Sequence, residues 1–229
     1  LQAVGASFVL KKKNDLSVAF VSSGEGTTSQ GDFHEALNWA SREKAPIIFH
    51  IENNNYAISV PIEEQISGGS VFDITSGYDS LMRYDINGCD FFESMIAFRK
   101  AFERTRDGKG PSLVISNVVR LLPHSSSDDH SKYRSKKEID DEKGKDPLII
   151  FKNIAVEKHS FTLNEFSKIE DKVDRELEAD LYWAEKQESP CPKSFKSNLL
   201  SNQNYDFSKE IDYMSDRIVM VDAINHALS

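Results

Sequence analysis

The sequence predicts an α/β protein: a doubly wound parallel sheet with flanking helices, followed by a C-terminal helical extension. Short apolar runs rich in β-branched and aromatic residues occupy residues 17–22, 46–51, 81–86 and 112–119, as buried strands do. Helical periods separate these runs, because residues 33–40 and 91–106 carry apolar side chains at i, i+3 and i+4 spacing. Strands that alternate with helices form a parallel sheet with helices on both faces.

The boundaries of the other elements follow from local signals. The helix over 33–40 is expected to start near Ser29, three residues before Asp32, and the helix over 91–106 to end at Gly108. Residues 120–146 are rich in polar turn formers without a hydrophobic period, which predicts a long surface loop. Thr162 and Glu165 form a capping box that opens a helix to about residue 187. Its apolar stripe comprises Phe166, Ile169, Val173, Leu177 and Leu181.

These features divide the chain into four parts. Residues 1–146 form the α/β domain, with a functional loop at 120–137, and residues 147–188 form the C-terminal helices. Residues 189–216 are read as a linker, and residues 217–229 begin a new segment in which Asp222 caps a helix. The chain lacks an initial Met and stops inside this helix, so we expect a longer parent polypeptide.

Composition excludes several classes of protein. The 229 residues are 39% hydrophobic and 28% charged, as in globular domains, and no apolar run approaches the roughly 20 residues that span a bilayer. The net charge of -9 disfavours nucleic acid as a partner. Cys89 and Cys191 form neither a disulfide framework nor a zinc pattern, so a cytoplasmic location is expected.

Oxygen-bearing residues follow two successive strands. Gly24, Glu25 and Gly26 come directly after the first strand, and an asparagine run that includes Asn54 follows the second. Open parallel sheets bind ligands at the carboxyl ends of their strands. A carboxylate, an amide oxygen and backbone carbonyls suit Mg²⁺ rather than zinc. A plain tight turn also explains the two glycines, and left-handed turn residues explain Asn53 or Asn55 taken singly.

The combination resembles the thiamine-diphosphate motif, because Asn54 lies 30 positions after Gly24. Residues 1 to about 210 are similar to the α subunit of the decarboxylating component of 2-oxo acid dehydrogenase complexes, above all the branched-chain (2-oxoisovalerate) type. The segments that carry this likeness are 24–38, 45–49, 53–59 and 120–134. The resemblance implies the thiamine-diphosphate-binding fold, with thiamine diphosphate and Mg²⁺ as cofactors. It also implies oxidative decarboxylation of 2-oxoisovalerate-like acids, with acyl transfer to lipoyl groups.

The resemblance also implies roles for individual residues. Glu25, Asn54 and the Tyr56 carbonyl would bind Mg²⁺, Arg120 would pair with the diphosphate, and His124 would assist acyl transfer as the catalytic residue. The residues expected to line the diphosphate are Gly24, Gly26, Thr27, Ala57 and Ile58. In such enzymes the cofactor lies between α and β subunits, so this chain would supply half a site and be inactive alone.

Partners and alternatives follow from the same likeness. Residues 218–228 are similar to the opening of the β subunit, so the expected partners are a β subunit or a fused β-like half, within a homo- or hetero-oligomer, and a lipoyl-bearing acyltransferase. Glu52 stands where branched-chain relatives often carry a basic residue, which leaves a pyruvate- or acetoin-type component open. A catalytically silent interaction module of the same fold, or phosphorylation at Ser125 or Ser135, are further readings.

Overall fold

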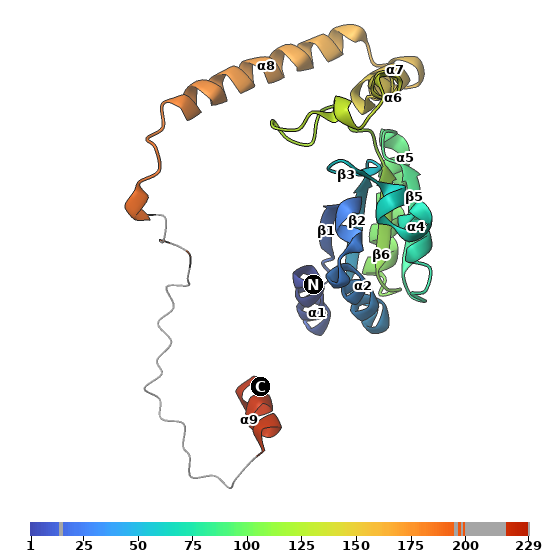
Figure 1. Cartoon of the computed structure of the whole chain (residues 1–229), viewed down its shortest axis with the longest axis vertical. Coiled ribbons are helices and arrows are strands. Elements are labelled where there is room, and N and C mark those ends of the chain that lie inside the picture. Colours follow the sequence, from blue (N-terminus) through green and yellow to red (C-terminus); the bar gives the residue numbers. More distant parts are fainter. Residues whose placement is uncertain (14–15, 195–196, 198, 200–218, 229) are drawn as a thin grey trace. The chain divides into compact units, whose positions relative to one another are not determined.

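The central element of the fold is a four-stranded parallel sheet. A computed structural model describes residues 1–13, 16–194, 197, 199 and 219–228 (Figure 1). The strands lie in the order β1-β2-β6-β5. Their bounds are β1 Ala19–Gly24, β2 Ile47–Asn53, β5 Met82–Asn87 and β6 Ser112–Asn117. All four predicted strands are confirmed, each within two residues at either end.

Helices cover both faces of this sheet, as predicted. Residues of α1 (Gln2–Lys12) and α2 (Gly31–Glu43) belong to the same buried cluster as Ile47, Phe49 and Ile51 of β2. The residue between them, Ile48, points to the opposite face and packs with α5 (Phe91–Arg106). This alternation is the side-chain period of a strand that is buried on both faces. Figure 1 shows the strands between the two sets of helices.

The connections place one switch point in the sheet. The chain leaves β1, passes through α2 and enters β2, then reaches β5, from which α5 returns it to β6. The connection from β1 to β2 and the connection from β5 to β6 both lead from an edge strand to a central strand, in opposite directions across the sheet. The winding direction therefore changes between β2 and β6. Ligands of open α/β sheets bind beyond the carboxyl ends of such strands. The elements between β2 and β5 are small: β3 Tyr56–Ala57, β4 Val60–Pro61, α3 Ile62–Gln65, η2 Ser67–Gly69 and α4 Val71–Ile74.

The later elements are mainly helical. They are η3 His130–Lys132, α6 Lys136–Lys143, α7 Pro147–Lys158, α8 Leu163–Glu185, η4 Pro192–Ser194 and α9 Met220–Leu228. The predicted capping box opens α8: Thr162 N donates to Glu165 Oε2 at 2.8 Å, and Glu165 N donates to Thr162 Oγ1 at 3.2 Å. None of the helices in the described ranges is both long enough and apolar enough to cross a membrane.

Three local predictions were wrong. The helix expected near Ser29 begins at Gly31, because Ser29 ends a 3-10 turn, η1 (Glu25–Ser29), and its hydroxyl bonds to the Gln65 carbonyl instead. The expected loop over 120–146 contains α6, which is fixed by a Ser135 cap rather than by an apolar stripe. Asp222 lies in the first turn of α9 and does not cap it, because the helix already starts at Met220.

The chain divides into two compact units, Leu1–Asp171 and Lys172–Ser229, and α8 contributes to both. The first unit contains the sheet and its covering helices. The second contains the later turns of α8, then η4 and α9. The boundaries predicted at residues 146, 188 and 216 stay predictions. Most of the predicted linker, together with residues 217 and 218, lies outside the described residues.

The stability of the fold should depend on the buried side of α2. Leu37 is fully buried against the sheet, whereas Val9 of α1 is about half exposed. Leu37→Ala should lower the free energy of unfolding by about 2–5 kcal/mol, because it removes buried methyl groups and leaves a cavity. Val9→Ala is the matched control and should change it by less than about 0.5 kcal/mol. Urea unfolding followed by circular dichroism measures both, and equal losses would contradict the assigned core.

Candidate functional site

The candidate site lies where β1 and β2 end side by side. Gly24 is paired in register with Glu52, so η1, which begins at Glu25, lies next to the asparagine run that follows β2. The parallel pairing of β2 with β6 brings Asn53 level with Asn117 at the same edge. The two motifs identified from the sequence therefore meet at one edge of the sheet, beside the switch point between β2 and β6.

Glu25 is the buried charge of this edge. Glu25 is only 1% exposed, and its carboxylate Oε2 accepts a hydrogen bond from Asn54 N at 3.2 Å. Burial raises the pKa of Glu25, although backbone N–H groups and the nearby Arg120 guanidinium favour the ionised form. A carboxylate removed from water needs a partner charge or hydrogen bonds to remain ionised. Glu25 is thus suited to bind a cation.

The asparagine run forms a sequence of Asx turns. Asn54 Oδ1 accepts from Tyr56 N at 3.0 Å, and Asn53 Oδ1 accepts from Asn55 N at 3.0 Å. Asn55 has a φ of 68°, a left-handed conformation that asparagine tolerates better than most residues. The reading as a left-handed turn residue is therefore confirmed for Asn55, whereas Asn53 is the last residue of β2 and is not left-handed. Asn54 Oδ1 retains a second lone pair with which to bind a ligand, in addition to its turn.

Gly26 and Thr27 contribute to η1 in different ways. A Cβ on Gly26 would lie 3.0 Å from the Cβ of Ala57, a contact so tight that Ala57 would have to move slightly, whereas the nearest atom to a Cβ on Gly24 is 4.0 Å away. Thr27 Oγ1 donates to the Gly24 carbonyl at 2.8 Å and lies 2.6 Å from Ser23 Oγ. The Thr27 hydroxyl is therefore bonded back to the start of the turn, and the two glycines let the backbone of η1 approach a ligand without an intervening side chain.

Arg120 joins the loop after β6 to the hairpin β3–β4. Its Nη1 donates to the Ile58 carbonyl at 2.6 Å, and its Nη2 donates to the Tyr133 hydroxyl at 2.7 Å. The guanidinium carbon lies 5.1 Å from the centre of the Tyr56 ring, a cation–π contact. Arg120 Nε is buried and has no hydrogen-bond partner in the described part of the chain. The predicted phosphate-binding arginine therefore lies beside Tyr56 and Ile58, to which its guanidinium is joined by a cation–π contact and a hydrogen bond.

Ile58 carries backbone strain next to this arginine. Its φ is 58°, which is a genuine outlier for a β-branched residue. Strained residues persist where their surroundings hold them, and they are concentrated at functional sites. The hydrogen bond from Arg120 to the Ile58 carbonyl is one such restraint.

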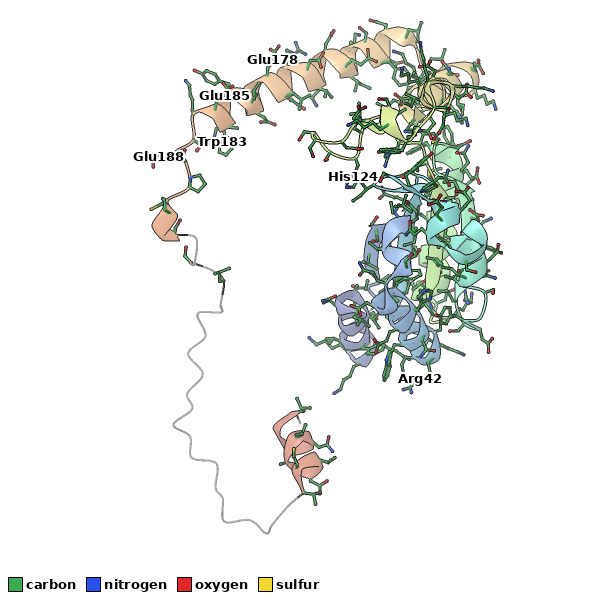
Figure 2. All side chains as sticks on the ribbon, in the orientation of Figure 1. Arg42, His124, Glu178, Trp183, Glu185 and Glu188 are labelled. Carbon is green, nitrogen blue, oxygen red and sulfur yellow. The ribbon has the colours of Figure 1, made fainter. Side chains whose placement is uncertain are left out.

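Loop 120–137 links Arg120 to His124 through two side chains. The Tyr133 hydroxyl donates to Asp128 Oδ2 at 2.6 Å, and the same oxygen accepts from His124 N at 2.9 Å. These two hydrogen bonds lower the pKa of Asp128. His124 itself is exposed on the loop, as Figure 2 shows. The loop thus holds the backbone of His124 and leaves its imidazole accessible.

Buried Arg134 anchors the base of the same loop. Its Nε lies 2.8 Å from Glu138 Oε1, its Nη2 lies 2.5 Å from Glu142 Oε2, and its Nη1 donates to the Arg120 carbonyl at 3.0 Å. These two carboxylates raise the pKa of Arg134, which stays charged. The i, i+4 spacing of Arg134 and Glu138 is the signal in the sequence for this ion pair. Gln65, which bonds to η1, had no such signal.

The donor set fits a hard divalent cation. Glu25 offers a buried carboxylate and Asn54 an amide oxygen, while Tyr56, one turn farther on, offers a backbone carbonyl. Such oxygen ligands, with positions left for phosphate and water, are typical of Mg²⁺ sites. No cluster of three or more His, Cys, Asp or Glu side chains suited to a metal occurs in the described ranges. A site with one carboxylate falls outside that pattern.

The raised pKa of Glu25 gives a prediction for the metal-free protein. An acid whose pKa is raised by folding destabilises the folded state when it is ionised. This destabilisation is absent below the pKa of the unfolded state and grows as the pH rises through the pKa of the folded state. Glu25→Gln, which keeps an acceptor for Asn54 N, should raise the thermal midpoint in EDTA at about pH 7.5 and much less at about pH 4. Exposed Glu64→Gln is the control. A midpoint at or below wild type at both pH values would contradict this prediction.

Comparisons with known proteins identify the family. The model of the family described as "Dehydrogenase E1 component" matches residues 1–193. The 2-oxoisovalerate dehydrogenase subunit alpha of Bacillus subtilis (strain 168) is 42% identical over 149 residues, which are 65% of this chain and 45% of that protein. The 3-methyl-2-oxobutanoate dehydrogenase subunit alpha of Mycobacterium tuberculosis (strain CDC 1551 / Oshkosh) is 36% identical over 148 residues, 65% of this chain and 40% of its own.

A third relative extends farther along the chain. The pyruvate dehydrogenase E1 component subunit alpha of Staphylococcus aureus (strain Mu50 / ATCC 700699) is 29% identical over 220 residues, covering 95% of this chain and 59% of that protein. The chain spans about half the length of these curated relatives. Since the family model matches most of its residues, the chain belongs to the dehydrogenase E1 component family.

Proposed function

We propose that the chain is the α part of the decarboxylating component of a branched-chain 2-oxo acid dehydrogenase complex, and that it binds the diphosphate end of thiamine diphosphate through Mg²⁺. The observation that carries this proposal is the buried Glu25 carboxylate beside Asn54 at the carboxyl ends of two adjacent parallel strands. A buried carboxylate whose pKa burial raises is well explained by a cation that the functional state contains.

The positions of the residues support the role that we propose for each of them. Glu25 and Asn54 would hold Mg²⁺ with the Tyr56 carbonyl, and Arg120 would pair with a diphosphate oxygen through its guanidinium group. The closed backbone of η1 and the strained hairpin would line the diphosphate through Gly24, Gly26, Thr27, Ala57 and Ile58.

His124 would serve the later part of the reaction. The loop fixes its backbone through Asp128 and leaves the imidazole exposed, which suits a proton donor or acceptor near neutral pH. The bound cofactor would supply the electron sink for decarboxylation, while this chain binds, orients and exchanges protons. His124 would assist transfer of the acyl group to a lipoyl group of the acyltransferase. The remaining half of the site would come from a β subunit or a fused β-like half.

The branched-chain assignment rests on the relatives. The two relatives of the branched-chain type are 42% and 36% identical, whereas two named for pyruvate are 33% and 29% identical. The latter match over more of the chain, so a pyruvate-type component is the second candidate.

Calorimetry on the complete protein with its partner half tests the cofactor site. Thiamine diphosphate should bind in the presence of Mg²⁺, and Glu25→Ala should weaken binding at least about tenfold, because it removes the buried ligand charge. Exposed Glu35→Ala is the matched control and should bind like wild type. Equal binding by wild type and Glu25→Ala would refute the metal site, and no binding by wild type would favour a silent interaction module.

Substrate choice is a separate measurement. The complete assembly, loaded with cofactor, should decarboxylate 2-oxoisovalerate with a kcat/KM at least about tenfold above that for pyruvate, since an added branched methyl pair in an apolar pocket contributes roughly 1–3 kcal/mol. A preference for pyruvate would overturn the branched-chain assignment and leave the cofactor proposal standing.

A further inference from the structure

Gln65 connects α3 to the turn that carries Glu25. We propose that Gln65 is a positioning residue that holds η1 in the shape required for the cation and the diphosphate, an inference that rests on the proposed function. Gln65 is the last residue of α3 and lies between two positions anchored in the core, since Ile62 and Ile66 are both buried. These anchors fix the backbone from which its side chain extends.

The side chain of Gln65 contacts both ends of η1. Its Nε2 donates to the Glu25 carbonyl at 3.2 Å and to Ser29 Oγ at 3.1 Å. Ser29 Oγ in turn lies 3.4 Å from the Gln65 carbonyl, to which it donates. Glu25 is the first residue of the turn and Ser29 the last. One side-chain amide therefore spans the whole turn.

The orientation of this amide is set by its partners. The Glu25 carbonyl can only accept, so the NH₂ group and not the oxygen of Gln65 must point toward it. Gln65 Oε1 is then buried and has no hydrogen-bond partner among the described residues. An unmade hydrogen bond of this kind is unfavourable. The hydrogen bonds of Nε2 to η1 therefore hold the amide in this orientation, even though its oxygen is unpaired among the described residues.

Gln65 also couples η1 to the asparagine run. The first residue of α3, Ile62, donates its N–H to the Asn55 carbonyl at 2.9 Å, so α3 begins on the turn that presents Asn54. A Cβ added to Gly26 would lie 3.0 Å from Ala57 and 3.8 Å from Gln65 Nε2. Gln65 thus packs over the backbone of η1 and is tied to the other half of the donor set. Loss of its amide would loosen the spacing between Glu25 and Asn54.

The test compares Gln65→Met with its neighbour Glu64→Met in the complete protein with its partner half. Met keeps the length of the side chain and removes both donors, while Glu64 is exposed on the same helix. Titration with thiamine diphosphate at fixed Mg²⁺ is followed by calorimetry, and thermal unfolding is recorded without cofactor. Gln65→Met should weaken cofactor binding about three- to tenfold, the range set by one net hydrogen bond, while Glu64→Met stays within about twofold of wild type.

A second variant covers the case in which Gln65→Met does not fold. Ser29→Ala removes one partner of the amide and should weaken binding about twofold to fourfold. A purely structural Gln65 would lower the thermal midpoint and leave the affinity of the folded protein unchanged; that result, or wild-type affinity in both variants, overturns the inference while the proposed function stands. A wild type that binds no cofactor overturns both.

Discussion

The burial of one carboxylate is the constraint on which this part of the molecule depends. Ionised groups are removed from water only at a large cost, which neighbouring dipoles and charges must offset. Here Asn54 N reaches the Glu25 carboxylate, and Arg120 contributes from the loop after β6. The two parallel strands deliver both motifs to one edge, and the hairpin and α3 then close around it. The site is therefore a property of the sheet topology as much as of its residues.

Much of this was predictable because the relevant signals are local or periodic. The strands alternate short apolar runs with helical periods, and the capping box at Thr162 and Glu165 formed as expected. The glycines and asparagines at the strand ends also lie together, since parallel strands end at a common edge. These features need no knowledge of distant contacts.

The rest depended on contacts between distant segments. Helix α6 has almost no apolar stripe, and it is held by the Ser135 cap and by buried Arg134, so hydrophobic periodicity could not find it. Ser29 looked like a helix start, but its hydroxyl is engaged 36 residues away by Gln65. Gln65 itself had no motif, because a lone glutamine acquires meaning only from the turn on which α3 places it.

Ile58 has a further consequence. Its left-handed backbone is unfavourable by roughly 1–2 kcal/mol for an L-residue. Arg120 Nη1 donates a hydrogen bond to the carbonyl of this strained residue. A phosphate oxygen is a stronger acceptor than a peptide carbonyl, so an anion bound at this edge would compete with the Ile58 carbonyl for the same guanidinium. Binding of the anion would then replace the hydrogen bond between Arg120 and the Ile58 carbonyl. The strained peptide of Ile58 would then lose the hydrogen bond that now helps to hold it in its left-handed conformation.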